Sequence, residues 1–175
     1  MTHTEVPELI CYRTDWRQYL TVPCRLPYYT YTKTMPEKMF IAERSDGAVI
    51  NLHDSRELAA LNSLNPIPRD RAWMQLYLLR EWGLDPRLNE GRRSPERQAQ
   101  LYAEGKSKTL HSKHLTGDAW DIVDHLLGWD CTDEFKRAVG RAARIVGAVS
   151  GIQWKSFGSF GDFAHSQWAN GKIVG

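Results

Sequence analysis

The chain has 175 residues, of which 42% are hydrophobic and 25% are charged, and its 23 lysines and arginines nearly balance its 21 aspartates and glutamates. These fractions are typical of a globular protein and exclude a largely disordered or membrane-embedded chain. The formal net charge of +2 gives no reason to expect a nucleic-acid partner. A chain of this length fits one main domain, because a second independent core would be cramped.

The start of the chain and its cysteines bear on where the protein is made. Residues 1–16 contain no apolar run of the kind found in a secretory signal, and no stretch approaches the ~20 apolar residues that a membrane-spanning helix needs. We therefore expect synthesis in the cytoplasm without a signal peptide, and no stable membrane insertion. Cys11, Cys24 and Cys131 are odd in number and widely spaced, which excludes a C-x-x-C zinc motif and favours buried or idle thiols.

The first part of the chain, residues 1–53, differs from the rest and is interpreted as an N-terminal extension. Its segment 28–34 is rich in Tyr and Thr, and its aromatic residues suggest docking of a substrate or partner. Further on, residues 38–43 and 48–52 flank a Ser-Asp-Gly turn sequence, a pattern that predicts a β-hairpin. The main domain is expected to span residues 54–175.

Capping residues and apolar spacing predict three helices in the middle of the chain. An Asp-Ser pair opens the first, over 54–61, and a broad apolar face gives the second, over 68–82. A Ser-Pro-Glu start gives the third, over 95–104. Glycines that commonly follow helix ends stand after the second and third helices, at Gly83 and Gly105.

The last third of the chain predicts a loop, a strand and a fourth helix. Residues 106–116 are polar and loop-like, and residues 119–123 alternate well enough for a strand. Thr132, followed by two acids, opens a helix with one apolar face. The face consists of Phe135, Val139, Ala142 and Val146. Residues 147–161 are rich in Gly and Ser, and no internal repeat is visible.

Histidines and acids concentrate in two segments of the second half. Residues 112–121 read Ser-Lys-His-Leu-Thr-Gly-Asp-Ala-Trp-Asp, and residues 161–165 read Gly-Asp-Phe-Ala-His. Zinc accepts imidazole nitrogen and carboxylate oxygen, and three protein ligands leave one coordination position for water in a catalytic site. His114, Asp121 and His165 would supply these three ligands.

A hydrolase also needs a base that lies close to the attacking water but does not bind the metal. Asp162, three residues before His165, can take this place, and Gly117 allows the backbone to turn tightly between the first two ligands. The alternatives are an accidental polar cluster and an inactive copy of such a site. The remaining histidines are interpreted as surface or hydrogen-bonded residues. They are His3, His53, His111 and His125.

The residues from Glu90 to Asp121 carry a family resemblance. They read E-G-R-R-S-P-E-R-Q-A-Q-L-Y-A-E-G-K-S-K-T-L-H-S-K-H-L-T-G-D-A-W-D, which resembles the zinc D-alanyl-D-alanine peptidase family with its pattern S-x-H-x-x-G-x-A-x-D, followed later by D/E-x-x-H. The chain is most similar to the family's phage endolysins, which are L-alanyl-D-glutamate peptidases, and the resemblance covers roughly residues 66–168. The matching positions are Ser112, His114, Gly117, Ala119, Asp121, Asp162 and His165.

The resemblance implies a role for each site residue. The two histidines and Asp121 would bind Zn2+, and Asp162 would be the general base. Arg93 would bind a substrate carboxylate or the developing oxyanion. Ser112 and Gln98 are further candidates for substrate binding, and we expect Ser112 to orient its loop by hydrogen bonding rather than to act as a nucleophile.

The resemblance also implies a fold: an α+β domain of the Hedgehog/D,D-peptidase-like kind, with a small, mainly antiparallel sheet that carries the zinc and helices packed on one side. Two departures concern substrate contacts. Where such endolysins commonly read P-H-F-E or P-H-F-Q, this chain reads Ala-His-Ser-Gln at residues 164–167, and its segment 154–162 is slightly longer.

The activity implied by the resemblance is hydrolysis of the peptidoglycan stem between L-alanine and D-glutamate, as in bacteriolysis by an endolysin. Alternatives within the family are a D,D- or L,D-carboxypeptidase and an antibacterial toxin. A toxin would have an immunity protein as partner, whereas an endolysin would depend on a holin. The alternative of another class is an inactive cell-wall-binding module. We expect a monomer that acts in the periplasm or cell wall after release or delivery.

Overall fold

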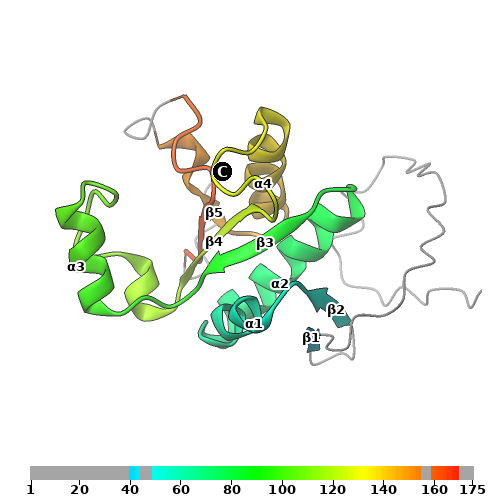
Figure 1. The fold of residues 1–175 in the computed structure, drawn as a ribbon, viewed down its shortest axis with the longest axis horizontal. Helices are drawn as coiled ribbons and strands as arrows, with labels where there is room; N and C mark the ends of the chain where they lie inside the picture. Colours follow the sequence, from blue (N-terminus) through cyan, green and yellow to red (C-terminus); the bar gives the residue numbers. More distant parts are fainter. Residues whose placement is uncertain (1–39, 44–48, 155–158, 170–175) are drawn as a thin grey trace, which may run out of the picture. The chain divides into compact units, whose positions relative to one another are not determined.

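The computed structural model describes residues 40–43, 49–154 and 159–169 (Figure 1). The Tyr-rich segment with its docking hypothesis lies outside the described residues, as do Cys11, Cys24 and the Ser-Asp-Gly turn sequence. Cys131 is buried, as expected. Within the described ranges, no helix has both the length and the apolar character needed to cross a membrane.

The described chain contains four α-helices and two antiparallel sheets. The helices are α1 Ser55–Asn62, α2 Pro66–Glu81, α3 Pro95–Ala103 and α4 Asp133–Ile145, and the short 3-10 turns are η2 Lys113–Thr116 and η3 Gly151–Gln153. The strands are β1 Phe40–Glu43, β2 Val49–Leu52, β3 Pro86–Glu90, β4 Ala119–Asp124, β5 Val149–Ser150 and β6 His165–Gln167. The larger sheet has the order β3-β4-β6-β5, so the α+β prediction is confirmed.

The predicted hairpin strands are confirmed. β1 pairs with β2 in antiparallel register from Phe40 opposite Leu52 to Glu43 opposite Val49. Ile50 and Leu52 of β2 are buried in the same core as the helices that follow. The domain boundary after residue 53 stays a prediction.

The four predicted helices form, because each has local start signals. Asp54 accepts hydrogen bonds from the first backbone N–H groups of α1, and Ser94 and Thr132 do the same for α3 and α4. The second helix, α2, begins two residues earlier than predicted, where Pro66 occupies a position that needs no N–H donor. Gly83, with φ of +78°, follows its end.

The larger sheet separates the core from the site. Directly opposite residues of an antiparallel pair point to the same face, and successive residues alternate. Asp121 lies opposite His165 on one face, whereas Trp120 and Ile122 face the other side and are fully buried. Trp120 Nε1 donates to Gln75 Oε1 of α2 at 2.8 Å, so the second face is fixed against the helices.

Strand β3 contains a register shift that matters for the site. Leu88 lies opposite Ile122, but Glu90 lies opposite Asp121, so Asn89 is an extra residue in the ladder. The bulge puts Leu88 into the core and Glu90 on the face that carries Asp121. The sequence predicts no strand here, because β3 begins with Pro86 and lacks alternation; the first residue of an edge strand is one of the few strand positions that accept proline.

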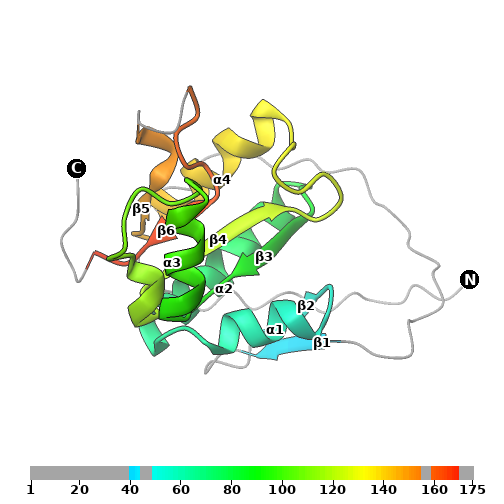
Figure 2. The ribbon, with the colours of Figure 1, turned by 60° about the vertical axis from the view of Figure 1, so that its left-hand side comes forward.

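Helix α3 is set apart from the other helices. The described core cluster takes residues from α1, α2 and α4 but none from α3. Figure 1 shows α3 at one edge, away from α2 and α4, and in Figure 2 it lies in front of the sheet. The expectation of helices packed on one side of the sheet therefore holds for α1, α2 and α4, while α3 is free to form a wall of the site.

Candidate metal centre

His114 is placed by a single 3-10 turn within the segment predicted to be a loop. Ser112 Oγ accepts a hydrogen bond from the backbone N–H of His114 at 3.3 Å, the kind of contact expected of a residue that orients its loop, and its substrate role stays a prediction. Gly117 ends the turn with a φ of +78°, a left-handed conformation that favours glycine. The chain thereby turns from His114 back into β4.

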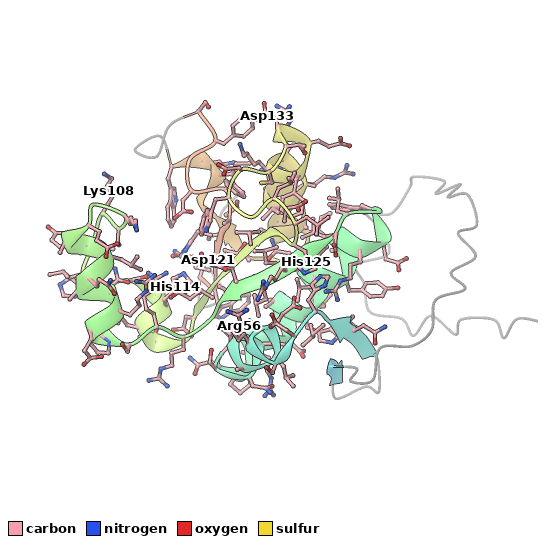
Figure 3. The ribbon with its side chains drawn as sticks, viewed as in Figure 1. Arg56, Lys108, His114, Asp121, His125 and Asp133 are labelled. Carbon is pink, nitrogen blue, oxygen red and sulfur yellow. The ribbon has the colours of Figure 1, made fainter. Side chains whose placement is uncertain are left out.

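Asp121 and His165 lie on neighbouring strands and face His114. Asp121 Oδ1 is 3.2 Å from His114 Nε2 and 3.4 Å from His165 Nδ1, and the two nitrogens are 3.2 Å apart. All three side chains are buried, and Figure 3 shows His114 and Asp121 together below the middle of the molecule. The three predicted metal ligands are therefore brought together with one atom each at the centre.

The outer hydrogen bonds of the histidines determine which nitrogens are free for a metal. His114 Nδ1 lies 2.7 Å from the carbonyl oxygen of Gly91, and His165 Nε2 lies 3.1 Å from Gln167 Oε1. Because both oxygens can only accept, these ring nitrogens donate, and the inner nitrogens of the neutral rings carry lone pairs. Two lone pairs and a carboxylate oxygen then converge, an arrangement that needs a cation.

The spacing of the donors fits zinc. Bonds of ~2.0–2.1 Å in a tetrahedral zinc site put neighbouring ligand atoms about 3.3–3.4 Å apart, and the three donor pairs here are separated by 3.2, 3.2 and 3.4 Å. The ring planes of His114 and His165 cross at 65°, so both can point their lone pairs at one ion. The residues present therefore fit zinc.

The buried ligands also set each other's charge. Burial alone would raise the pKa of Asp121, but the charges and hydrogen bonds of His114 and His165 hold it well below its usual range. Burial would lower the pKa of His114, yet the Asp121 carboxylate raises it on balance. Asp121 is therefore an anion at neutral pH, and a proton or a metal ion must balance its charge.

Asp162 lies beside the ligands, in the turn that precedes β6. Its backbone N–H donates to the Gly151 carbonyl at 2.9 Å, and its side chain lines the same cavity as the ligands. Burial and then the charge of Asp121 raise the pKa of Asp162. A Cβ on Gly151 would lie 2.5 Å from the Asp162 carbonyl oxygen and 3.1 Å from His165 Cβ, so only glycine permits this approach.

Arg93 holds the outer oxygen of the metal-ligating carboxylate. Its Nη2 is 3.4 Å from Asp121 Oδ2 and is also paired with Glu90, while Nη1 donates to Gln98 Oε1 at 2.7 Å. Gln98 is itself buried and contacts the ligand shell through Arg93. The predicted substrate roles of Arg93 and Gln98 stay predictions, and the observed contacts give both residues a positioning role.

A cavity of ≈ 830 Å³ opens over the three ligands and Asp162. One wall consists of α3 and the loop after it, which is polar and basic. The opposite wall is aromatic: Trp154 lies 4.9 Å from the His165 ring, and Trp129 packs edge-on against Phe163 at 5.8 Å. The volume lies within the usual range of small-molecule sites and has room for a short peptide.

A second cluster of two histidines and an aspartate lies at the other end of β4. His53 Nε2 is 3.0 Å from Asp85 Oδ1, and His125 Nδ1 is 3.1 Å from Asp85 Oδ2. The two rings stack at 3.6 Å with their planes only 13° apart. The interpretation of His53 and His125 as hydrogen-bonded histidines is confirmed.

The sequence did not indicate two residues that shape the metal site. Glu90 reaches the site through the bulge in β3, and Gly151 supports the turn that carries Asp162 and His165. A Gly in a Gly- and Ser-rich segment gave no signal, and Glu90 begins the stretch that carries the resemblance but occupies none of its motif positions. Both effects depend on chain segments that meet only in the folded protein.

The chain is 33% identical to the L-Ala D-Glu endopeptidase ChiX of Serratia marcescens, over 65% of this chain and 86% of that one, with a TM-score of 0.48. It is 16% identical to the L,D-carboxypeptidase DacB of Streptococcus pneumoniae, over 75% and 85% of the two chains, with a TM-score of 0.48. It is 17% identical to the vancomycin resistance D,D-pentapeptidase VanY in complex with Zn(II), over 75% and 79%, with a TM-score of 0.40.

No family model and no curated protein matches this sequence. Among these similarities, the identity to the Serratia enzyme over most of its length decides family membership. The superpositions are too loose to add an argument of their own.

Proposed function

This chain belongs to the zinc D-alanyl-D-alanine peptidase family together with its Serratia relative, and we propose that it cleaves the peptidoglycan stem peptide between L-alanine and D-glutamate. It is a zinc metallopeptidase that hydrolyses peptidoglycan. The observation that carries the proposal is the buried His-Asp-His donor set, which converges beneath a peptide-sized cavity beside an acid that is not a ligand. Identity to an L-Ala D-Glu endopeptidase supports the choice of bond.

The metal would be held by His114 Nε2, Asp121 Oδ1 and His165 Nδ1, the three atoms that converge. Zinc bound by three protein ligands acts as a Lewis acid toward a carbonyl group and makes water a stronger acid. Hydrogen bonds to Gly91 and Gln167 fix the tautomers of the two histidines, and Arg93 fixes the second oxygen of the carboxylate. These outer contacts keep the donor atoms aimed at one point.

Asp162 is the general base in the proposed reaction. Its carboxylate removes a proton from the water that attacks the L-alanine carbonyl carbon, and the resulting acid delivers that proton to the D-glutamate nitrogen as the C–N bond breaks. A raised pKa suits a group that must both accept and return a proton near neutral pH. The products are a peptide with a new L-alanine carboxylate and one with a free D-glutamate amine.

The rival activities differ in the bond that is cut or in whether any bond is cut. A D,D- or L,D-carboxypeptidase would release terminal D-alanine from the same cavity. A wall-binding module would keep the metal and lose turnover. The residues on either side of His165, Ala164 and Ser166, differ from the Pro and Phe of the endolysins that the sequence resembles, so the choice of bond needs a direct measurement.

Mass spectrometry of purified peptidoglycan digested with the zinc-loaded protein tests the proposal. We expect fragments with new L-alanine carboxyl ends and free D-glutamate amines, and none with the His165→Ala control. Released D-alanine alone would move the assignment to a carboxypeptidase. No product from walls of several chemical types would contradict an enzymatic role.

The biological setting is a further part of this proposal. The resemblance to phage endolysins favours an enzyme that reaches the wall after release by a holin, and delivery as a toxin with an immunity protein is the alternative. Expression of the chain in bacteria with and without a holin would distinguish the two. Lysis that depends on the holin supports the endolysin, whereas lysis prevented by a neighbouring gene product supports the toxin.

A further inference from the structure

The cavity over the metal ligands has an uneven distribution of charge. Its acids, Glu90, Asp121 and Asp162, all lie at the metal end, where Glu90 is paired with Arg93 and Asp121 is a ligand. The wall formed by α3 and the loop after it contributes bases, and none of the cavity-lining residues described on this wall is acidic. The bases are Arg97, Lys106, Lys108 and Lys113. Because the whole chain is nearly neutral, this wall is a local feature.

The lysines of this wall are accessible from the cavity. Lys106, Lys108 and Lys113 are exposed, and Figure 3 shows Lys108 on the loop beyond α3. The Lys106 side chain keeps 68% of its surface exposed although it lies 2.8 Å from Glu104, and an exposed pair of this kind is weak. An anionic ligand in the cavity can therefore compete for these charges.

The loop that carries the lysines is anchored to the metal end by buried Gln98. Its Nε2 donates to Ser107 Oγ at 2.8 Å and to the Thr109 carbonyl at 2.5 Å, while its Oε1 accepts from Arg93. One buried amide thus ties the basic loop to the residue that holds the ligand Asp121. The loop that carries the lysines is therefore held beside the metal end, which is a requirement for selecting one substrate over another.

We propose that this basic wall selects stem peptides with free carboxylates over stems in which those carboxylates are amidated. This inference rests on the proposed cleavage between L-alanine and D-glutamate. In such a stem, the α-carboxylate of D-glutamate and any second carboxylate on the following diamino acid both lie on the amine side of the bond. The wall therefore binds the half of the substrate that leaves as the free amine.

The expected selectivity is moderate, because the lysines are exposed to water. Exposed ion pairs each change an equilibrium by a factor of roughly 1.5 to 5, so three of them together give on the order of tenfold. The preference is expected to weaken as salt is added, since ions screen exposed charges. It appears in KM rather than kcat, because the carboxylates are bound equally in substrate and transition state.

The test uses synthetic stem peptides that differ only in amidation: none, at the D-glutamate carboxylate, at the diamino-acid carboxylate, or at both. For the wild type we expect kcat/KM to fall roughly tenfold from the free to the doubly amidated peptide. The two singly amidated peptides show which carboxylate is recognised. In the triple variant Lys106→Gln, Lys108→Gln, Lys113→Gln, the kcat/KM of the free peptide divided by that of the doubly amidated peptide should approach one.

A matched control removes three exposed arginines outside the cavity, through Arg56→Gln, Arg69→Gln and Arg144→Gln. It lowers the net charge equally and should keep the wild-type ratio. If the wild type cuts free and amidated peptides equally well, the selectivity inference is wrong while the proposed function stands. If it cuts none of them, the proposed function is wrong. Should the triple variant fail to fold, Lys106→Gln with Lys108→Gln provides the same comparison.

Discussion

Among the residues that the structure describes, two clusters each combine two histidines and one aspartate, and they differ in burial and in geometry. Side chains of the metal centre, His114, Asp121 and His165, are 1%, 8% and 7% exposed. Those of the second cluster, His53, Asp85 and His125, are 22%, 50% and 32% exposed. Water can therefore satisfy the second cluster, whereas the first must be satisfied from within.

The two clusters also differ in which oxygens of the aspartate contact the histidines. In the metal centre one oxygen of Asp121 faces both histidines, so three donors meet, and Arg93 takes the other oxygen. In the second cluster each histidine takes a different oxygen of Asp85. Its ligand atoms lie within 4.8 Å of one another, but no single carboxylate oxygen is paired with both rings.

Ring orientation leads to the same conclusion. An imidazole lone pair lies in the plane of its ring, so an ion bound by two rings must lie in both planes. Planes that cross at 65° allow this, but stacked rings with planes 13° apart at 3.6 Å do not. The comparison shows that residue type alone does not make a metal site, and it predicts one bound zinc per chain.

The largest expected effect comes from removing one histidine of each cluster in turn. His165→Ala should lose bound zinc and lower the hydrolysis rate by on the order of 10³-fold or more, because two donors do not hold the ion. His125→Ala should keep one zinc per chain and nearly full activity. Metal content by mass spectrometry and peptide cleavage check both variants. If the wild type binds two zinc ions and His125→Ala loses one of them, the second cluster is a metal site and the prediction is wrong.

Asp162→Asn separates zinc binding from catalysis at the first cluster. The amide cannot accept the proton of the attacking water, so kcat should fall by about 10²- to 10⁴-fold while zinc remains bound. The measurement is turnover of a stem peptide together with zinc content of the same sample. Unchanged turnover would remove Asp162 from the mechanism.

Arg93→Met tests the way in which the Asp121 carboxylate is held. Loss of the guanidinium frees the outer oxygen of Asp121, and outer contacts of this kind are worth about 10- to 100-fold in metal affinity. We expect zinc affinity, measured by competition with a chelating dye, to fall within that range. Arg93→Lys, which keeps the charge without the planar fork, should recover only part of the loss.

The smallest effect is expected at the second cluster. Asp85→Asn removes the charge between two histidines, but all three groups are partly solvated, so the free energy of unfolding should change by less than ~1 kcal/mol. Zinc content and activity should not change. Urea unfolding and metal analysis check this, and a loss of several kcal/mol would show that the cluster stabilises the fold.

The sequence predicted the structural features that are determined by neighbouring residues or by the matched motif. Caps at Asp54, Ser94 and Thr132 lie next to the helices they start, so the helices could be located. The motif fixes the order of the three candidate ligands, His114, Asp121 and His165, which the structure brings together. The turn residue Gly117 was predicted for the same reason.

The sequence could not predict features that arise where distant segments meet. Strand β6 has only three residues, His165–Gln167, and becomes a strand because β4 and β5 lie on either side. Glu90 acquires its partner Arg93 and its place beside Asp121 through a bulge that leaves no clear pattern. The meeting of His53 with His125 joins the ends of β2 and β4, which no local signal connects.

The bulge in β3 is a place beside the cavity where residues can be added or removed. Leu88 and Glu90 keep their partners Ile122 and Asp121, while Asn89 between them is exposed and lines the cavity. Deleting Asn89 would still leave Glu90 opposite Asp121 and Leu88 in the core, and a longer insertion would project over the cavity. Evolution or design can therefore change how far this edge of the cavity extends while the candidate metal ligands stay in place.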